Sequence, residues 1–147
     1  MIVTSRRQED NTSGDVDADN FYFEDVFISK KEGGKWGPAK NIGSPINTPY
    51  HDSSISLSKD GNRLFIYKDT GGGDVYNCDF EGGKWSEPKY LSAKINSTTY
   101  AEHSITEDKK GEILIYSSSR PGGEGGIDLH MITKNSSGEW YKTKSLG

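Results

Sequence analysis

Two pairs of acidic and imidazole side chains are the residues of this chain best suited to chemistry. His51 stands beside Asp52, and Glu102 stands beside His103, and the two acids are 50 positions apart. Carboxylates and imidazoles gathered at one place could hold a metal ion or exchange protons with a substrate. They could equally line a polar channel filled with water. The choice depends on whether the fold brings the two pairs together.

A second candidate is an acidic run in the N-terminal third of the chain. Asp15, Asp17 and Asp19 alternate as the first, third and fifth ligands of a calcium loop do. The sixth position is Asn20 instead of glycine, and the twelfth is Val26 instead of glutamate. Two interpretations stay open, a weak calcium site and a solvated acidic loop. We expect no other cofactor.

Composition excludes several classes of protein. The 147 residues carry a formal charge of −4 that is spread along the chain, whereas a nucleic-acid interface needs a clustered basic face. No apolar run has the length of a membrane span. The single cysteine, Cys78, has no partner for an internal disulfide, and we expect it to serve as a small apolar residue on a strand.

Internal repetition is the main evidence for the fold. Gly33-Gly34-Lys35-Trp36 is repeated by Gly82-Gly83-Lys84-Trp85, 49 residues later, and Leu64-Phe65-Ile66-Tyr67 matches Ile113-Leu114-Ile115-Tyr116. A period of about 50 residues with several short strands is typical of a β-propeller blade. We therefore predict an all-β chain with a partial blade at 1–50 and full blades at 51–100 and 101–147.

Short strands joined by glycine turns are expected within each unit. In the second unit these are Ser53–Ser58, Arg63–Lys68, Asp74–Phe80 and Trp85–Leu91, with turns at Lys59-Asp60-Gly61-Asn62, Gly71-Gly72-Gly73 and Gly82-Gly83. The third unit repeats the plan, with four antiparallel strands at His103–Glu107, Glu112–Ser118, Ile127–Thr133 and Trp140–Leu146. The first unit begins with strands at Ile2–Arg7 and Phe21–Lys30 and lacks the innermost strand.

The middle strands favour a propeller over a sandwich. Leu64-Phe65-Ile66-Tyr67 is apolar on both faces, so both faces must be covered. Blades stacked around an axis cover them in this way. About three blades are too few for a closed ring. We therefore expect either a segment of a longer propeller or two copies that complete a six-bladed ring.

Several recurring residues are expected to support this scaffold. We predict that Arg7 pairs with Asp25, and Arg120 with Asp128, across the loop between two strands; a catalytic acid beside an arginine is the alternative. Three tryptophans recur before the last strand of each unit, as core or as platforms for a sugar. They are Trp36, Trp85 and Trp140. Two asparagines in equivalent crossover loops, Asn47 and Asn96, are expected to bond nearby backbone.

Three segments together resemble a known family. Ser118-Ser119-Arg120-Pro121-Gly122-Gly123-Glu124-Gly125-Gly126-Ile127-Asp128-Leu129, Leu57-Ser58-Lys59-Asp60-Gly61, and Lys84-Trp85-Ser86-Glu87-Pro88 followed by Ile95-Asn96 are similar to the WD-like β-propeller repeat of TolB-type proteins, in the form found in envelope proteins of Bacteroidota. The chain departs from this pattern at Lys68-Asp69-Thr70. The resemblance implies a periplasmic, outer-envelope or exported setting.

The function expected from these observations is that of a non-catalytic binding or scaffold module for a protein or a glycan-type polymer. In a propeller the innermost strands line the central channel, so the acids and imidazoles at 51–52 and 102–103 would gather at one mouth. The alternative is a hydrolase or lyase that uses Asp52 and Glu102.

Overall fold

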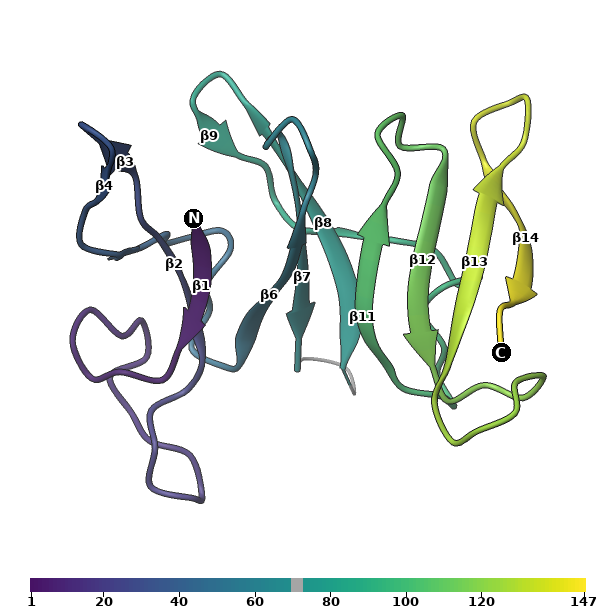
Figure 1. Ribbon diagram of the computed structural model, residues 1–147. Coiled ribbons are helices and arrows are strands. Elements are labelled where there is room, and N and C mark those ends of the chain that lie inside the picture. The colour runs from purple at the N-terminus through teal and green to yellow at the C-terminus, as the bar shows by residue number, and fades with distance from the viewer. Residues whose placement is uncertain (70–72) are drawn as a thin grey trace.

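Antiparallel sheets make up the ordered structure of the chain. The computed structural model describes residues 1–69 and 73–147, and three main sheets follow one another along the chain and stand side by side (Figure 1). Sheet 1 contains β1 (Ile2–Ser5), β2 (Asp25–Ile28) and β5 (Lys40–Asn41); sheet 2 contains β6 (Asp52–Leu57), β7 (Arg63–Lys68), β8 (Asp74–Glu81), β9 (Lys84–Trp85) and β10 (Lys89–Tyr90); sheet 3 contains β11 (Glu102–Glu107), β12 (Ile113–Ser118), β13 (Asp128–Lys134) and β14 (Trp140–Ser145). A separate hairpin joins β3 (Lys31–Glu32) to β4 (Lys35–Trp36).

Tight turns at the upper end of the sheets in Figure 1 connect successive strands. Gly82 and Gly83 join β8 to β9 with φ angles of 59° and 83°, and a two-residue hairpin loop of this kind favours glycine at both positions. The predicted turn at Gly71-Gly72-Gly73 falls largely outside the described residues. Among the described residues there is no helix with the length and apolarity that a membrane crossing requires.

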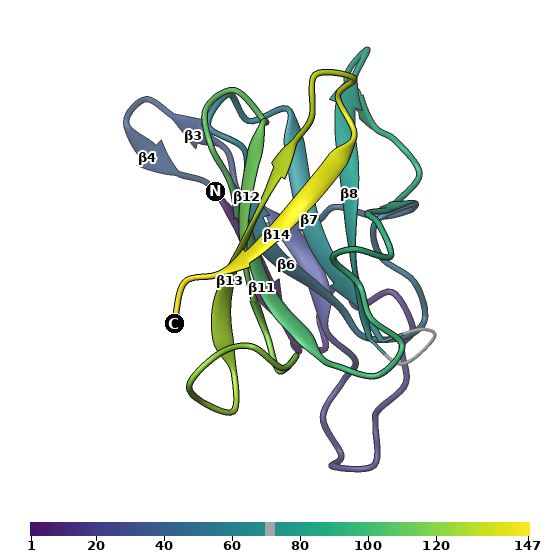
Figure 2. The same ribbon diagram turned by 90° about the vertical axis from the view of Figure 1, so that its right-hand side faces the viewer.

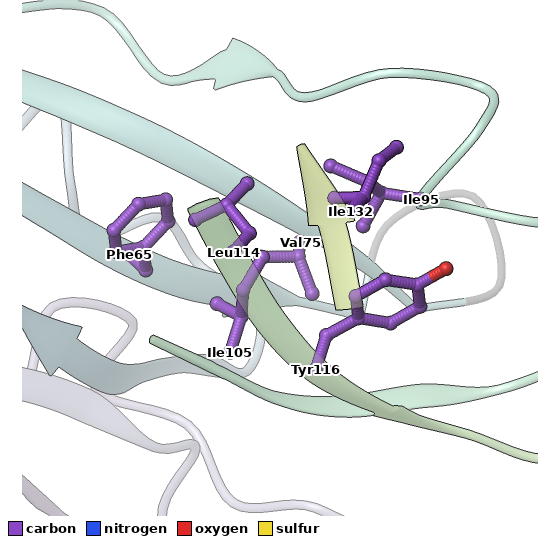
Figure 3. Close-up of a cluster of buried hydrophobic side chains, with 7 residues drawn as sticks. All are labelled: Phe65, Val75, Ile95, Ile105, Leu114, Tyr116 and Ile132. Atoms are coloured by element: carbon purple, nitrogen blue, oxygen red, sulfur yellow. The ribbon is translucent and has the colours of Figure 1, made fainter. Parts of the chain in front are cut away.

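Two apolar cores fill the spaces between consecutive sheets. The 1–2 core consists of Val26, Ile46, Leu64, Ile66 and Cys78. The 2–3 core consists of Phe65, Val75, Ile95, Ile105, Leu114, Tyr116 and Ile132 (Figure 3). Strand β7 contributes Leu64 and Ile66 to one core and Phe65 to the other, so its two faces are both covered. The sequence-based expectation for this strand is therefore confirmed.

Strand pairing corrects the register of the internal repeat. Leu64 pairs with Cys78, whereas Leu114 pairs with Ile132. Leu64 also lies opposite Leu57, and Leu114 opposite Glu107. The counterpart of Leu64 is therefore Leu114 and not Ile113, as the sequence match suggested. Because side chains alternate across a strand, this shift of one residue decides which positions face which neighbouring sheet.

The outer face of sheet 3 is less covered than the matching face of sheet 2. Ile115 and Leu129 are 36% and 49% exposed, whereas their counterparts Phe65 and Val75 are 1% and 0% exposed. Figure 2, which views the molecule from this side, shows β13 and β14 in front. The sheets thus form an open row.

The tryptophans differ in burial. Trp85 packs against the 1–2 core and Trp140 against the 2–3 core, and both are partly buried. Trp36 is 53% exposed because the β3–β4 hairpin pairs only with itself in the described chain. The expectation of a packed core residue is therefore wrong for Trp36.

Candidate functional site

The four residues predicted to cluster at a channel mouth have separate sets of partners. Asp52 and Glu102 are buried, at 0% and 1% exposed, at the first positions of β6 and β11. His51 is partly buried beside the loop that joins β1 to β2, and His103 is exposed on β11. With Ser53, Ser104 and other side chains of β6, β7 and β11, His103 lines an open cavity of about 460 Å³.

Asp52 forms a buried ion pair with Lys68. The Lys68 Nζ donates to Asp52 Oδ1 at 2.5 Å and to the carbonyl of Ile46 at 2.7 Å. The other carboxylate oxygen accepts from the backbone N–H of Thr48 at 2.5 Å and from its hydroxyl at 2.7 Å. These contacts tie the crossover loop after sheet 1 to β6 and β7. We call this set the Asp52 clamp.

Glu102 is held in the same way in sheet 3. Its Oε1 accepts from the Ser118 hydroxyl at 2.7 Å and from the Arg120 guanidinium at 3.0 Å, and its Oε2 accepts from the N–H of Ser97 at 3.0 Å. Arg120 also donates to the carbonyls of Lys94, at 2.9 Å, and Ile95. We call this set the Glu102 clamp. It ties the crossover loop after sheet 2 to β11 and β12.

In these clamps, both acids that the sequence offered for catalysis are bonded to other parts of the fold. Each carboxylate is paired with a cation and with further donors, which satisfies a buried charge and holds its oxygens in fixed directions. Lys68 is a residue that sequence reasoning missed. Its signal was the departure of Lys68-Asp69-Thr70 from Ser118-Ser119-Arg120, which moves the positive charge by two positions.

His51 fastens the acidic loop to the start of β6. Its Nδ1 accepts from the N–H of Glu24 and its Nε2 lies 3.2 Å from Asp17 Oδ2. The N–H of Ala18 and the contact with His51 lower the pKa of the Asp17 carboxyl below its usual value. The His51 ring also packs edge-on against Phe23, with centroids 4.9 Å apart.

The three candidate calcium ligands are directed to different partners. Asp19 forms a two-bond pair with Arg6, at 2.6 and 2.7 Å, which together with the N–H of Phe21 lowers the pKa of its carboxyl. Asp17 meets His51, and Asp15 is exposed. Across residues 1–69 and 73–147, no group of three or more His, Cys, Asp or Glu side chains is arranged to hold a metal ion.

The arginines bond to other groups than the aspartates predicted for them. Arg7 donates to the carbonyls of Glu9 and Ala39, at 3.1 and 2.7 Å, and its guanidinium lies 4.0 Å from the centroid of the Phe27 ring. Asp25 instead accepts from the N–H of Thr12 at 2.6 Å.

The second predicted arginine pair also takes other partners. Arg120 meets Glu102, and Asp128 accepts from the N–H of Gly125 at 3.1 Å. The predicted pairings of Arg7 with Asp25 and of Arg120 with Asp128 are therefore wrong.

Asn47 and Asn96 bind a distant strand instead of nearby backbone. The Asn47 side chain accepts from Val26 N–H at 2.8 Å and donates to Val26 C=O at 2.9 Å. Asn96 does the same to Val75, at 3.1 and 2.8 Å. Each asparagine thus fixes its crossover loop to a strand of the preceding sheet, β2 or β8, and the prediction that it bonds nearby backbone is wrong.

An open groove lined by charged side chains lies between sheets 2 and 3, and sequence reasoning missed it. It has a volume of about 500 Å³ and lies between the β6–β7 and β11–β12 turns. Arg63 spans it, donating to Asp79 at 2.8 Å and to Glu107 of sheet 3 at 3.2 Å. Lys109 and Lys110 stand on its rim. We call it the turn groove.

Comparisons of the chain with family models, with curated proteins and with solved structures gave no match.

Proposed function

We propose that the chain is a segment of about three blades of a WD-like, TolB-type β-propeller, and that it works as a non-catalytic binding or scaffold module. Support comes from three consecutive antiparallel sheets, with an apolar core between each pair of neighbours. The recurrence of the clamp and of the asparagine bridge at both junctions also fits stacked repeats.

The turn groove is the proposed binding site, and a protein or a glycan-type polymer of the bacterial envelope is the proposed partner. The main support for this site is the pairing of Arg63 with Asp79 of sheet 2 and Glu107 of sheet 3, which joins the two sheets beneath an open, charged surface. A preorganised surface of this kind binds without a large ordering cost. Both lysines and acids line the groove, and such a mixture suits a partner that carries both carboxylates and amines, as peptidoglycan does.

Co-sedimentation with purified peptidoglycan tests this proposal. Lys109→Glu combined with Lys110→Glu reverses the charge of the groove rim, and we expect affinity to fall about tenfold because two attractive contacts become repulsive. Lys31→Glu combined with Lys35→Glu makes the same charge change on the β3–β4 hairpin and should bind as the natural chain does. Equal binding by all three proteins, or cleavage of the polymer, would contradict the proposal.

A further inference from the structure

A small pocket adjoins the turn groove in the junction between sheets 2 and 3. It has a volume of about 150 Å³ and shares two of its lining residues, Arg63 and Glu107, with the groove. A site for a whole ligand has a volume of about 300–1,000 Å³, so this pocket has the size to take one substituent of a ligand that lies in the groove. We call it the side pocket. Its other lining residues are Phe65, Asn77, Leu91, Lys134 and Trp140.

The side pocket is built entirely from sheets 2 and 3 and the loop that leaves sheet 2. Its lining residues come from β7, β8, β11, β13 and β14 and from the segment that follows β10. A further blade of a longer propeller would stack on the opposite face of sheet 1 or of sheet 3. It would therefore leave the side pocket as it is.

Apolar side chains form one wall of the side pocket. Phe65 lies at one end of the 2–3 core (Figure 3), and Leu91 and Trp140 pack against the same core. Such a wall cannot replace the water that a charged group loses when it is buried. The substituent that fits this wall therefore has an apolar part.

Two polar side chains of the side pocket have hydrogen-bonding groups to offer. The Glu107 side chain is 7% exposed, and its Oε2 accepts from Arg63 at 3.2 Å, whereas no described residue donates to its Oε1. Asn77 lies opposite Phe65, and its amide makes no hydrogen bond with another described residue. Because a carboxylate oxygen accepts and an amide NH₂ donates, the pocket offers one acceptor and one donor beside its apolar wall.

The charges around the side pocket favour a neutral substituent. An ammonium group would meet two cations, Arg63 and Lys134, and one carboxylate, that of Glu107. A carboxylate would find Arg63 already paired with Asp79 and Glu107, at 2.8 and 3.2 Å, and would lose water against the apolar wall. A neutral group with one donor, one acceptor and a methyl end meets neither difficulty.

We propose that the side pocket is a subsite for the acetamido group of an amino sugar, an inference that rests on the proposed function of the turn groove as a site for a glycan-type polymer. The N–H of the acetamido group donates to Glu107 Oε1, and its carbonyl accepts from the Asn77 amide. Its methyl group lies against Leu91 and Trp140, while the sugar ring stays in the groove. The polymer is therefore one whose sugars are N-acetylated.

Three β-linked tetrasaccharides that differ only in the substituent next to the anomeric carbon test this subsite. Chitotetraose carries acetamido groups, its de-N-acetylated form carries amines, and cellotetraose carries hydroxyls. Isothermal titration calorimetry with the natural protein gives the three affinities. We expect chitotetraose to bind at least about tenfold more tightly than the other two, since it alone supplies the donor, the acceptor and the methyl group.

Two variants place the acetamido group in the side pocket. Asn77→Asp should weaken chitotetraose binding about tenfold, because a carboxylate cannot donate to the carbonyl. Leu91→Trp should fill the pocket and abolish the preference for chitotetraose over cellotetraose. Leu91→Met, which nearly conserves volume, is the matched control and should change the affinity less than about threefold. Amide NMR signals of Asn77 and Glu107 should shift during the titration, and that of Thr48, in the Asp52 clamp, should not.

Three results would overturn the subsite. They are absence of binding at millimolar chitotetraose, equal binding of chitotetraose and cellotetraose, and equal binding of chitotetraose by the natural protein and Asn77→Asp. None of them affects the turn groove if peptidoglycan still binds in a way that depends on Lys109 and Lys110. Chitotetraose carries no charge, so Lys109→Glu combined with Lys110→Glu should change its affinity less than about threefold. Chitotetraose binding without peptidoglycan binding would overturn the partner proposed for the groove and leave the subsite standing.

Discussion

The two junctions between sheets both neutralise a buried carboxylate, but they use a different cation to do so. In each, a carboxylate at the first position of β6 or β11 is buried against a cation and a backbone N–H of the preceding crossover loop. The cation is Lys68 in the Asp52 clamp and Arg120 in the Glu102 clamp. Lys68 occupies the strand position of Ser118, two residues before that of Arg120. The junction therefore requires a charge at one point in space, which more than one sequence position can supply.

The environments of the two cations also differ. The Lys68 side chain is 8% exposed and that of Arg120 is 17% exposed. Lys68 is a point charge with two protein acceptors, whereas Arg120 spreads its donors over Glu102 and two carbonyls and stacks 5.0 Å from the Tyr116 ring. Loss of the cation should therefore lower the free energy of unfolding more at the Asp52 clamp, between sheets 1 and 2, than at the Glu102 clamp, between sheets 2 and 3.

Lys68→Met is expected to have the largest effect. It leaves the Asp52 carboxylate, which is 0% exposed, without its counter-ion, and breaking a buried pair in this way costs about 3–5 kcal/mol of the free energy of unfolding. Arg120→Met should cost roughly half as much, about 2 kcal/mol, because the Arg120 side chain is more exposed than that of Lys68 and water already screens more of its interaction with Glu102. Urea unfolding at pH 7 measures both. An Arg120 variant less stable than the Lys68 variant would reverse the comparison.

Asn47→Ala and Asn96→Ala test the hydrogen bonds from an asparagine side chain to strand backbone that both junctions contain. Each leaves a buried backbone N–H, of Val26 or Val75, without its partner, which costs about 1–3 kcal/mol. The two losses should agree within about 1 kcal/mol. Asn62→Ala, at an exposed turn, serves as a control and should change stability by about 0.5 kcal/mol or less. A small loss at only one of the two junctions would show that the bridges are not equivalent.

Moving the cation in sheet 3 tests whether a lysine at position 118 can replace Arg120. Arg120→Thr alone should destabilise the protein as Arg120→Met does. Adding Ser118→Lys places an ammonium where Lys68 stands in sheet 2, and should restore about 1 kcal/mol or more of the lost free energy of unfolding. Urea unfolding of both single variants and of the double variant gives the coupling. Absence of any recovery would mean that the second junction depends on the guanidinium itself.

Sequence periodicity was sufficient for the all-β class and for the two-sided burial of β7. Apolar pattern and glycine turns depend on neighbouring residues, so they are visible in the chain. The partners of Asp52, Glu102 and Arg7 were not predictable in the same way. Each pairing depends on which loop crosses which strand end, and on a register that an error of one residue reverses. Lys68 departs from the sequence repeat, yet it pairs a cation with the buried carboxylate of its sheet, as Arg120 does.

The smallest expected effect concerns Cys78, the residue of the 1–2 core whose counterpart in the 2–3 core is Ile132. Burial raises the pKa of its thiol to about 12, whereas an unfolded cysteine titrates near about 8.5. Below that lower value both states hold the proton, and the thiol adds no pH dependence. As pH rises above it, only the unfolded state loses the proton, so the free energy of unfolding must fall.

The difference in stability between the natural protein and Cys78→Val isolates this contribution, since other groups titrate equally in both. We expect the difference to shift against the natural protein by about 1 kcal/mol between about pH 8.5 and 9.5. An aromatic disulfide reagent should leave the folded thiol unmodified over the same range and react once urea unfolds the chain. Rapid reaction in the folded state would mean that the 1–2 core opens more readily than its buried side chains imply.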